Sequence, residues 1–99
     1  MQISKKLRML GLAAKAGKVI TGIDMCGKAV KQRKAKLIVL AEDAAESTKK
    51  EFSNSNIPVV TVENKEILGK FTGKEYRSVC VVCDAGFAKA IQESEESEC

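Results

Sequence analysis

The stretch Lys36-Leu37-Ile38-Val39-Leu40-Ala41 ("KLIVLA") decides the fold class of this chain, because five consecutive apolar residues follow one lysine. The run has the length of a β-strand, and a strand that is apolar on both faces must be covered on both faces. We therefore predict that residues 36–41 form an interior strand of a sheet that has helices packed on each side.

The segments around this strand alternate between helical and strand patterns. Residues 4–16 carry apolar residues at helical spacing, with Ser4 as the N-cap and Gly17 as the C-terminal stop. The same reasoning predicts further helices at 22–33, 44–52, 64–71 and 84–92, and strands at 18–20, 57–62 and 77–83. Alternating elements with short connections indicate an α/β layered fold around a small mixed sheet.

The length of 99 residues is enough for one hydrophobic core. We expect a single domain over residues 1–92, followed by an acidic, disordered tail at 93–99 that is rich in Glu and Ser. No apolar run approaches the roughly 18 residues of a membrane span. Lysines near the N-terminus interrupt any secretory signal, so the expected compartment is the cytoplasm and the cysteines are expected to be reduced.

Charge is distributed unevenly along the chain. Residues 1–36 contain ten Lys or Arg and one acidic residue, a net charge of +9, whereas residues 78–99 have a net charge of −4. A basic block of this density favours an anionic partner, most often nucleic acid, over a merely solvated surface. The chain has no His, the commonest general base and zinc ligand, and we expect no catalytic site, metal or cofactor.

Two motifs suggest other functions. Residues 22–28 have the G-x-x-x-x-G-K spacing of a phosphate-binding loop, but Ala29 stands where that loop needs a hydroxyl. Thr21 and Asp24 instead have the spacing of a capping box that starts a helix at Gly22. The second motif, Cys80-x-x-Cys83, falls in a predicted strand, where positions three apart face opposite sides. We therefore disfavour a nucleotide-binding enzyme and a zinc or redox site.

The predicted helix at 22–33 separates apolar residues from basic ones. The residues expected to face the core are Ile23, Cys26, Ala29 and Val30. Lys28 and Lys31 lie on the other side, with Lys18 before the helix and Lys36 after it. The start of a helix also attracts anions through its dipole and free N–H groups. With only four aromatic residues for stacking bases, the pattern favours structured RNA bound through phosphates and a few base edges.

Several short motifs occur here in the order and spacing of a known family. They are Gly17-Lys18-Val19-Ile20-Thr21-Gly22, Lys28-Ala29-Val30, the stretch 36–44, Ile57-Pro58-Val59-Val60, and Leu68-Gly69-x-x-x-Gly73. Over residues 3–92 the chain resembles the ribosomal protein L7Ae/L30e/Gadd-type family. Residues 73–77 and 84–89 are most similar to its small bacterial branch. The resemblance implies a three-layer α/β/α sandwich with a mixed four-stranded sheet, L30e-like, that binds kink-turn RNA.

The resemblance also implies where RNA binds. In the family, the start of the second helix enters the widened major groove at tandem sheared G·A pairs, and the loop before the last strand, here 72–77, covers an extruded nucleotide. Together with the basic block, this predicts an RNA site formed by Lys18, Gly22, Ile23, Asp24, Met25, Lys28, Lys31, Lys74, Tyr76 and Arg77. Lys28 matches the family's phosphate- and base-contacting lysine.

This sequence departs from the family pattern at two places. Asp24 and Met25 stand where the family has Asn and Glu, and a carboxylate can accept a hydrogen bond from guanine but cannot donate one as Asn can. The loop at 72–77 is charged where RNA-binding members are apolar. Both departures concern affinity or motif preference and leave the predicted fold unchanged.

We hypothesise a cytoplasmic, monomeric, non-enzymatic protein that docks a kink-turn or a related internal loop, ribosomal RNA included. Ribosomal or transcription–translation proteins are further candidate partners. The alternative is a protein-interaction adaptor on the same fold, in which the charged loop at 72–77 and the acidic tail contact a protein.

Overall fold

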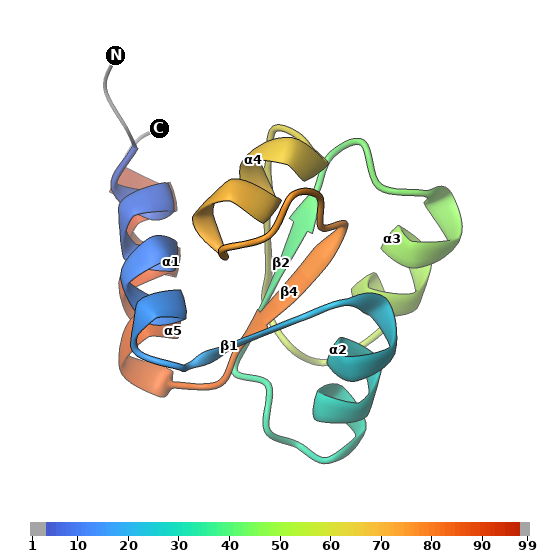
Figure 1. The fold of residues 1–99 in the computed structure, drawn as a ribbon. Helices are drawn as coiled ribbons and strands as arrows, with labels where there is room; N and C mark the ends of the chain where they lie inside the picture. Colours follow the sequence, from blue (N-terminus) through green and yellow to red (C-terminus); the bar gives the residue numbers. More distant parts are fainter. Residues whose placement is uncertain (1–3, 98–99) are drawn as a thin grey trace.

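The computed structural model describes residues 4–97, in which helices cover both faces of a four-stranded mixed sheet (Figure 1). In chain order the elements are α1 (Lys5–Lys15), β1 (Val19–Thr21), α2 (Ile23–Lys31), β2 (Leu37–Ala41), α3 (Glu46–Ser53), β3 (Val59–Val62), α4 (Lys65–Phe71), β4 (Val79–Val82) and α5 (Ala85–Ser97). This arrangement confirms the predicted three-layer α/β/α sandwich. Within the described range, no helix is both long enough and apolar enough to cross a membrane.

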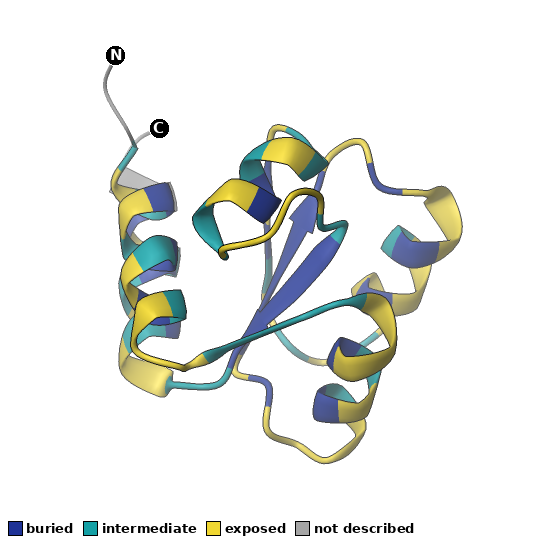
Figure 2. Ribbon diagram, in the orientation of Figure 1, coloured by how far each residue is buried: buried dark blue, intermediate teal, exposed yellow. Residues whose placement is uncertain are grey.

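The sheet has the strand order β1-β4-β2-β3. β2 is parallel to β3 and antiparallel to β4, and β4 is antiparallel to β1. Every residue of β2 and β4 is buried, because these strands are central and both of their faces are covered (Figure 2). The prediction that residues 36–41 contain an interior strand is therefore confirmed.

Two hydrophobic cores lie on opposite faces of the sheet. The α1-side core packs α1, α4 and α5 against the sheet, and the α2-side core packs α2 and α3 against the other face. Cys80 belongs to the α1-side core, whereas Cys83 packs against the α2-side core. The predicted separation of these two cysteines is confirmed, and burial raises the pKa of the Cys80 thiol well above its usual range.

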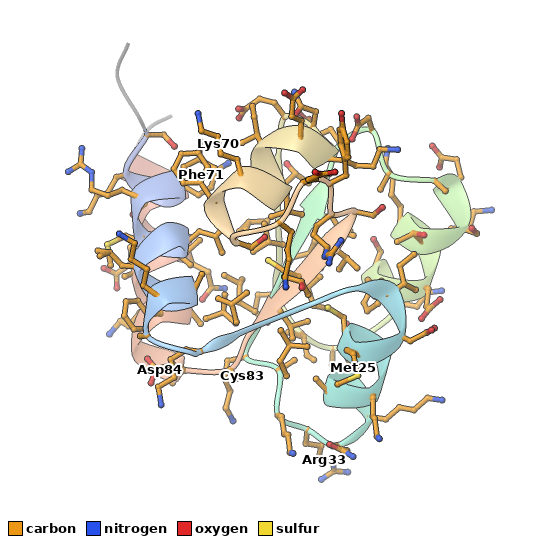
Figure 3. The ribbon with its side chains drawn as sticks, viewed as in Figure 1. Met25, Arg33, Lys70, Phe71, Cys83 and Asp84 are labelled. Atoms are coloured by element: carbon orange, nitrogen blue, oxygen red, sulfur yellow. The ribbon has the colours of Figure 1, made fainter. Side chains whose placement is uncertain are left out.

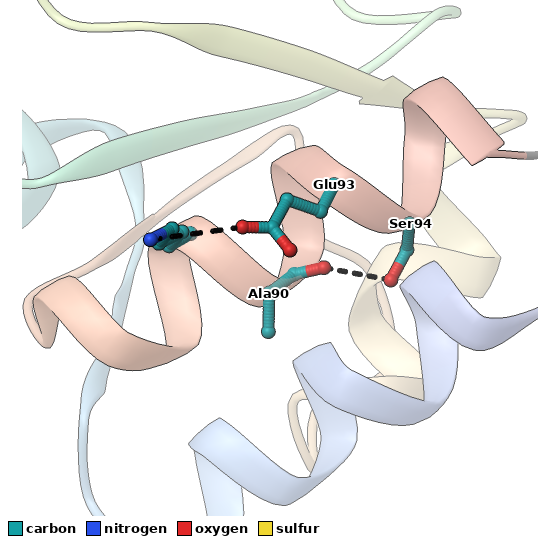
Figure 4. A network of polar contacts seen from close by, with 4 residues as sticks. Ala90, Glu93 and Ser94 are labelled. Atoms are coloured by element: carbon teal, nitrogen blue, oxygen red, sulfur yellow. Dashed lines mark hydrogen bonds and ion pairs between the residues drawn. The ribbon is translucent and has the colours of Figure 1, made fainter.

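The last helix is longer than predicted. Instead of ending near Gln92, α5 continues to Ser97, so the expectation of a disordered tail starting at residue 93 is wrong for residues 93–97, and residues 98–99 lie outside the described range. The Ser94 hydroxyl is buried and donates a hydrogen bond to the Ala90 carbonyl at 2.7 Å, and Lys89 pairs with Glu93 at 3.9 Å (Figure 4). The acidic composition of residues 93–97 did not predict a helix there, because the helix depends on the packing of α5 along α1, which is distant in sequence.

Three helix starts follow the sequence closely. The Ser4 hydroxyl accepts from the Leu7 N–H at 3.2 Å at the start of α1. The Asn64 side chain accepts from the Ile67 N–H at 2.8 Å, and a carboxylate oxygen of Asp84 accepts from the N–H three residues later at 2.9 Å. These local caps were all predicted, and they set where α1, α4 and α5 begin.

Candidate nucleic-acid interface

The start of α2 is exposed and has no side-chain cap. Gly22 is the N-cap, with a φ of 95°, and no side chain accepts a hydrogen bond from the first-turn N–H groups. The first helical bond runs from the Cys26 N–H to the Gly22 carbonyl at 2.9 Å. The N–H groups of residues 23–25 therefore lack acceptors within the helix and point toward any ligand placed at this end.

The predicted capping box at this position is wrong. Thr21 is the last residue of β1, where it pairs with Cys80, so it precedes the actual N-cap by one residue. The positive φ of Gly22 makes the turn from strand to helix, a conformation that glycine adopts without a steric penalty. Residues 23–28 are helical and cannot form the wide loop that wraps a nucleotide phosphate, which excludes the P-loop interpretation.

The first turn of α2 presents two apolar side chains and one carboxylate to solvent. Ile23 is 43% exposed and Met25 is 56% exposed, and Asp24 lies between them. The prediction that Ile23 faces the core is therefore wrong. Cys26 and Ala29 are the α2 residues buried against the sheet. Burial raises the pKa of Cys26 to about 12, so its thiol is a neutral core group that donates to the Ile20 carbonyl.

Basic side chains continue along α2 from this first turn. Lys28 and Lys31 are both exposed. A hollow of about 240 Å³ lies beside Lys28, lined by Ile20, Met25, Lys28, Ala29, Gln32 and Lys34. Ile20, Gln32 and Lys34 were not among the predicted site residues, because β1, α2 and the turn after α2 meet only when the helix packs on the sheet. We call the exposed residues Met25, Lys28, Lys31, Gln32 and Lys34 the α2 face.

The α2 face ends in a tight turn that holds an arginine in an unusual conformation. Arg33 has a φ of 60°, a left-handed position where helices commonly place glycine. The Lys34 N–H donates to the Ala29 carbonyl at 2.9 Å and closes the turn. Arg33 (Figure 3) and Lys34 are both exposed, so this turn places two cations at the end of the helix.

Lys18 lies apart from the start of α2. It is separated from Gly22 by the three residues of β1, a length of about 10 Å. Its carbonyl accepts from the Cys83 N–H at 2.8 Å. Desolvation raises the pKa of the Cys83 thiol, and the charges of Lys34 and Lys36 counteract part of that shift. The charges of Lys34 and Lys36 therefore lie near Cys83, and the backbone of Lys18 lies at this same end of the sheet, opposite the start of α2.

The loop at residues 72–78 ends beside the start of α2. Thr21 pairs with Cys80, so the chain leaving β1 and the chain entering β4 emerge at the same end of the sheet. Lys74 is exposed and Tyr76 is 61% exposed. Arg77 is half-buried; its Nη1 donates to the Tyr76 carbonyl at 2.8 Å, and its Nε is buried without a hydrogen-bond partner in the described residues. The end of this loop and the first turn of α2 thus lie at the same end of the sheet.

Gly69 holds the loop at residues 72–78 in place. A Cβ at this position would lie 2.6 Å from the carbonyl carbon and oxygen of Glu75, a distance that backbone atoms cannot tolerate. The Lys74 N–H donates to the Gly69 carbonyl at 2.8 Å, and the Arg77 N–H donates to the Lys65 carbonyl at 3.1 Å. The sequence suggested no role for Gly69 in the site, because this contact depends on the loop folding back over α4.

The assembled surface combines unpaired helix N–H groups, exposed lysines, apolar side chains and one arginine donor. It brings together nine of the predicted residues, namely Gly22, Ile23, Asp24, Met25, Lys28, Lys31, Lys74, Tyr76 and Arg77, along α2 and its adjoining loop. It holds no group of three or more His, Cys, Asp or Glu that could bind a metal ion, within the described residues. The chemistry is that of binding a polyanion with some apolar contact.

Comparisons with known proteins agree with this description. Residues 3–92 match the model of the ribosomal protein L7Ae/L30e/S12e/Gadd45 family. The RNA-binding protein YlxQ of Bacillus subtilis (strain 168) is 39% identical over 87 residues, which are 84% of this chain and 87% of that protein. The large ribosomal subunit protein eL30 of Methanosarcina mazei is 34% identical over 76 residues, covering 75% of this chain and 74% of that one.

A solved structure has the same fold. It is a protein of unknown function from Bacillus halodurans C, which superimposes with a TM-score of 0.88 at 37% identity. The match covers 95% of this chain and 99% of the other. The architecture described above is therefore shared over nearly the whole length of both chains.

Proposed function

Since this chain belongs to the ribosomal protein L7Ae/L30e/S12e/Gadd45 family, we propose that it is an RNA-binding protein that recognises a kink-turn or a related internal loop, ribosomal RNA included. The relatives are named as RNA-binding and ribosomal proteins, which agrees with the expected non-enzymatic role. We further propose that it acts in the cytoplasm as a monomer. The three free thiols among the described residues suit a reducing compartment.

The observation that carries this proposal is the uncapped start of α2 beside the loop at residues 72–78. The free N–H groups of residues 23–25 and the positive end of the helix dipole favour phosphates or base acceptors at this point. Lys28 lies on the exposed side of the next turn, within reach of a strand that contacts Met25. A distorted internal loop fits this protruding tip better than a regular RNA helix does, because the major groove of A-form RNA is deep and narrow.

The loop supplies the second half of the proposed site. Tyr76 offers an exposed ring for an unstacked base, and Lys74 offers a charge for the adjoining phosphate. Arg77 is half-buried, and the accessible part of its guanidinium group adds a positive charge to this half of the site. We propose that Lys18, Lys34 and Lys36 contact phosphates of a flanking stem, since they lie at the far end of the α2 face.

Binding to a kink-turn duplex and to a plain duplex of equal length, measured by fluorescence anisotropy across salt, tests this proposal. A specific complex that uses about four to six phosphates should give a log–log slope of affinity against salt near −4 to −5. We expect the kink-turn to bind more tightly at every salt concentration, with the gap persisting where non-specific binding has faded. Equal affinity for both duplexes throughout would exclude kink-turn recognition.

A further inference from the structure

A second concave surface lies on the layer of helices opposite the α2 face. It is a groove of about 430 Å³ between α1 and the end of α4. Lys70 and Phe71, the last two residues of α4, lie beside α1 in Figure 3. Thr72 and Gly73 continue the lining at the point where the loop at residues 72–78 begins. Apart from Thr72 and Gly73 at the start of that loop, none of the lining residues belongs to the candidate nucleic-acid interface.

The floor of the groove is apolar and open. Leu12 is 48% exposed, and Phe71 packs partly against the α1-side core while its remaining surface faces the groove. Gly11 lies next to the Phe71 ring: a Cβ at this position would make an ordinary contact of 3.5 Å with the Phe71 Cδ1 atom. Among the exposed large apolar residues described, Ile23, Met25 and Tyr76 belong to the nucleic-acid interface, so Leu12 needs a different explanation.

The rim of the groove is cationic. Arg8 and Lys15 come from α1 and Lys70 comes from α4, and no acidic residue contributes to the lining. In the described part of the chain, ion pairs join Lys49 to Glu46 and Lys89 to Glu93, and neither pair neutralises these three cations. A site with this rim complements negative charge, and its floor complements an apolar side chain.

We propose that this groove docks an acidic segment of a partner protein that inserts an apolar side chain between α1 and α4. The apolar floor would bury Leu12 and the free surface of Phe71, and the three rim cations would pair with carboxylates on either side of the anchor. This division of roles is typical of interfaces, in which a buried apolar centre is surrounded by polar contacts. A helical segment with acidic residues around an apolar stripe has the required pattern.

RNA is a poorer occupant of this groove. Single-stranded nucleic acid needs exposed aromatic faces on which bases stack, but the floor here is Leu12, Gly11 and a ring that is only partly accessible. The groove also does not depend on the proposed RNA function. It meets the RNA-facing loop only at Thr72 and Gly73, whereas that loop reaches the start of α2 at its other end. A protein partner and an RNA can therefore bind at the same time.

Selection of short random peptides displayed on phage, using the full chain as bait, tests this proposal. The wild-type protein is immobilised, and soluble Leu12→Glu protein is added as a competitor. The competitor removes peptides that bind to other surfaces, and peptides that bind the groove should still be recovered on the wild type. We expect the recovered sequences to be enriched in Asp and Glu around an apolar residue. Sequences without this enrichment would overturn the proposal.

The most enriched peptide is then synthesised and titrated against variants. Leu12→Glu and Lys15→Glu should each weaken binding by about tenfold or more, as expected for the loss of an interface anchor or a close charge pair. Lys50→Glu makes the same charge change as Lys15→Glu on the exposed surface of α3 and should change the affinity by less than about twofold. Equal losses in Lys15→Glu and Lys50→Glu would show attraction by net charge alone and overturn the docking site.

Two further measurements separate the other occupants. Titration with single-stranded oligouridine and oligoadenosine should show no dependence on Leu12, and a loss of affinity in Leu12→Ser, which leaves the net charge unchanged, would assign the groove to RNA instead. Sedimentation of the wild type should show a monomer. A dimer that dissociates in Leu12→Glu would assign the groove to a second copy of this chain. Kink-turn affinity should be the same in Leu12→Ser and wild type, whether or not the RNA proposal holds.

Discussion

At the scale of single residues, a negative charge in the first turn of α2 has opposite effects on helix stability and on the proposed RNA binding. Asp24 is the acidic residue in that turn, where a negative charge stabilises the helix through its dipole. The same charge lies at the tip that we propose meets RNA phosphates, where it is unfavourable. Lys28 on the following turn supplies the compensating attraction. Stability and RNA affinity should therefore respond differently to changes at these two positions.

Replacing Lys28 with alanine should weaken kink-turn binding by about 1–3 kcal/mol if the lysine contacts a base edge. Its side chain is exposed, so the free energy of unfolding should change by less than about 0.5 kcal/mol. Lys50→Ala on α3 is the matched control, since that lysine is also exposed and lies outside the proposed site. Indistinguishable affinities for the two variants, measured by anisotropy, would remove Lys28 from the interface.

Replacing Asp24 with asparagine should separate stability from binding. Loss of the first-turn charge should lower the free energy of unfolding by about 0.3–1 kcal/mol. Kink-turn binding should tighten by about 1 kcal/mol, because the amide both donates and accepts at a base edge and no longer repels phosphate. Asp24→Glu keeps the negative charge and should show no gain in kink-turn affinity. Weaker binding by Asp24→Asn would instead mean that the carboxylate itself accepts from the RNA.

At the scale of elements, the candidate site depends on how the loop at residues 72–78 is anchored. The loop leaves α4, folds back over Gly69 and enters β4 beside the start of α2. Two backbone hydrogen bonds, to the carbonyls of Gly69 and Lys65, fix the two ends of the charged segment. They leave its side chains free to contact a partner. The geometry of the proposed RNA site therefore depends on a buried glycine that is not itself one of the proposed contact residues.

Replacing Gly69 with alanine should displace this loop. The added Cβ would meet the Glu75 carbonyl at 2.6 Å, and we expect a loss of about 1–3 kcal/mol in the free energy of unfolding. Gly27→Ala is the control, because it also changes a glycine within a helix but its Cβ would make only an ordinary 3.5 Å contact with a Glu51 carboxylate oxygen. That variant should gain up to about 1 kcal/mol from helix propensity.

The Gly69→Ala variant should also lose kink-turn selectivity while keeping its salt-dependent affinity for plain duplex. The reason is that the α2 face stays in place when the loop moves. Chemical denaturation and the two-duplex assay together check this outcome. If Gly69→Ala folds as stably as Gly27→Ala and binds the kink-turn normally, the loop is not positioned by this contact.

At the scale of the whole molecule, the sheet distributes positive charge over two surfaces. The α2 face lies on one layer, and the groove rim of Arg8, Lys15 and Lys70 lies on the other. All of these cations except Lys70 come from the basic block, which carries a net charge of +9 over residues 1–36. The ion pairs Lys49–Glu46 and Lys89–Glu93 involve none of these groove cations or α2 lysines. The free protein should therefore experience net repulsion among its own cations.

Added salt should raise the thermal stability of the free protein. Increasing NaCl from about 0.05 to 0.5 M shortens the Debye length and screens repulsion within the basic block. We expect Tm, followed by circular dichroism, to rise by about 2–8 °C, the shift that about 0.5–1 kcal/mol produces in a domain of this size. Lys31→Glu should show a smaller rise because it already relieves part of the repulsion. A Tm that falls with salt would point to stabilising ion pairs instead.

Local patterns predicted much of this molecule correctly. The apolar run at 36–41 predicted a central strand, and three caps predicted where helices begin, because these features depend on neighbouring residues. The failures have a common cause. Ile23 was expected in the core, Thr21 was expected to cap α2, and residues 93–97 were expected to be disordered. Each depends on how an element packs against another one distant in sequence.

By itself the sequence determined the order of elements, the two-faced burial of β2, the basic character of the first third and the residue types available to an RNA. Only the tertiary structure decided which of those residues act together. The pairing of Thr21 with Cys80 joins the start of α2 to the loop at residues 72–78, and the packing of α4 beside α1 opens the groove around Leu12. Strand register and helix packing set these distances, and both arise from contacts between segments that lie far apart in the chain.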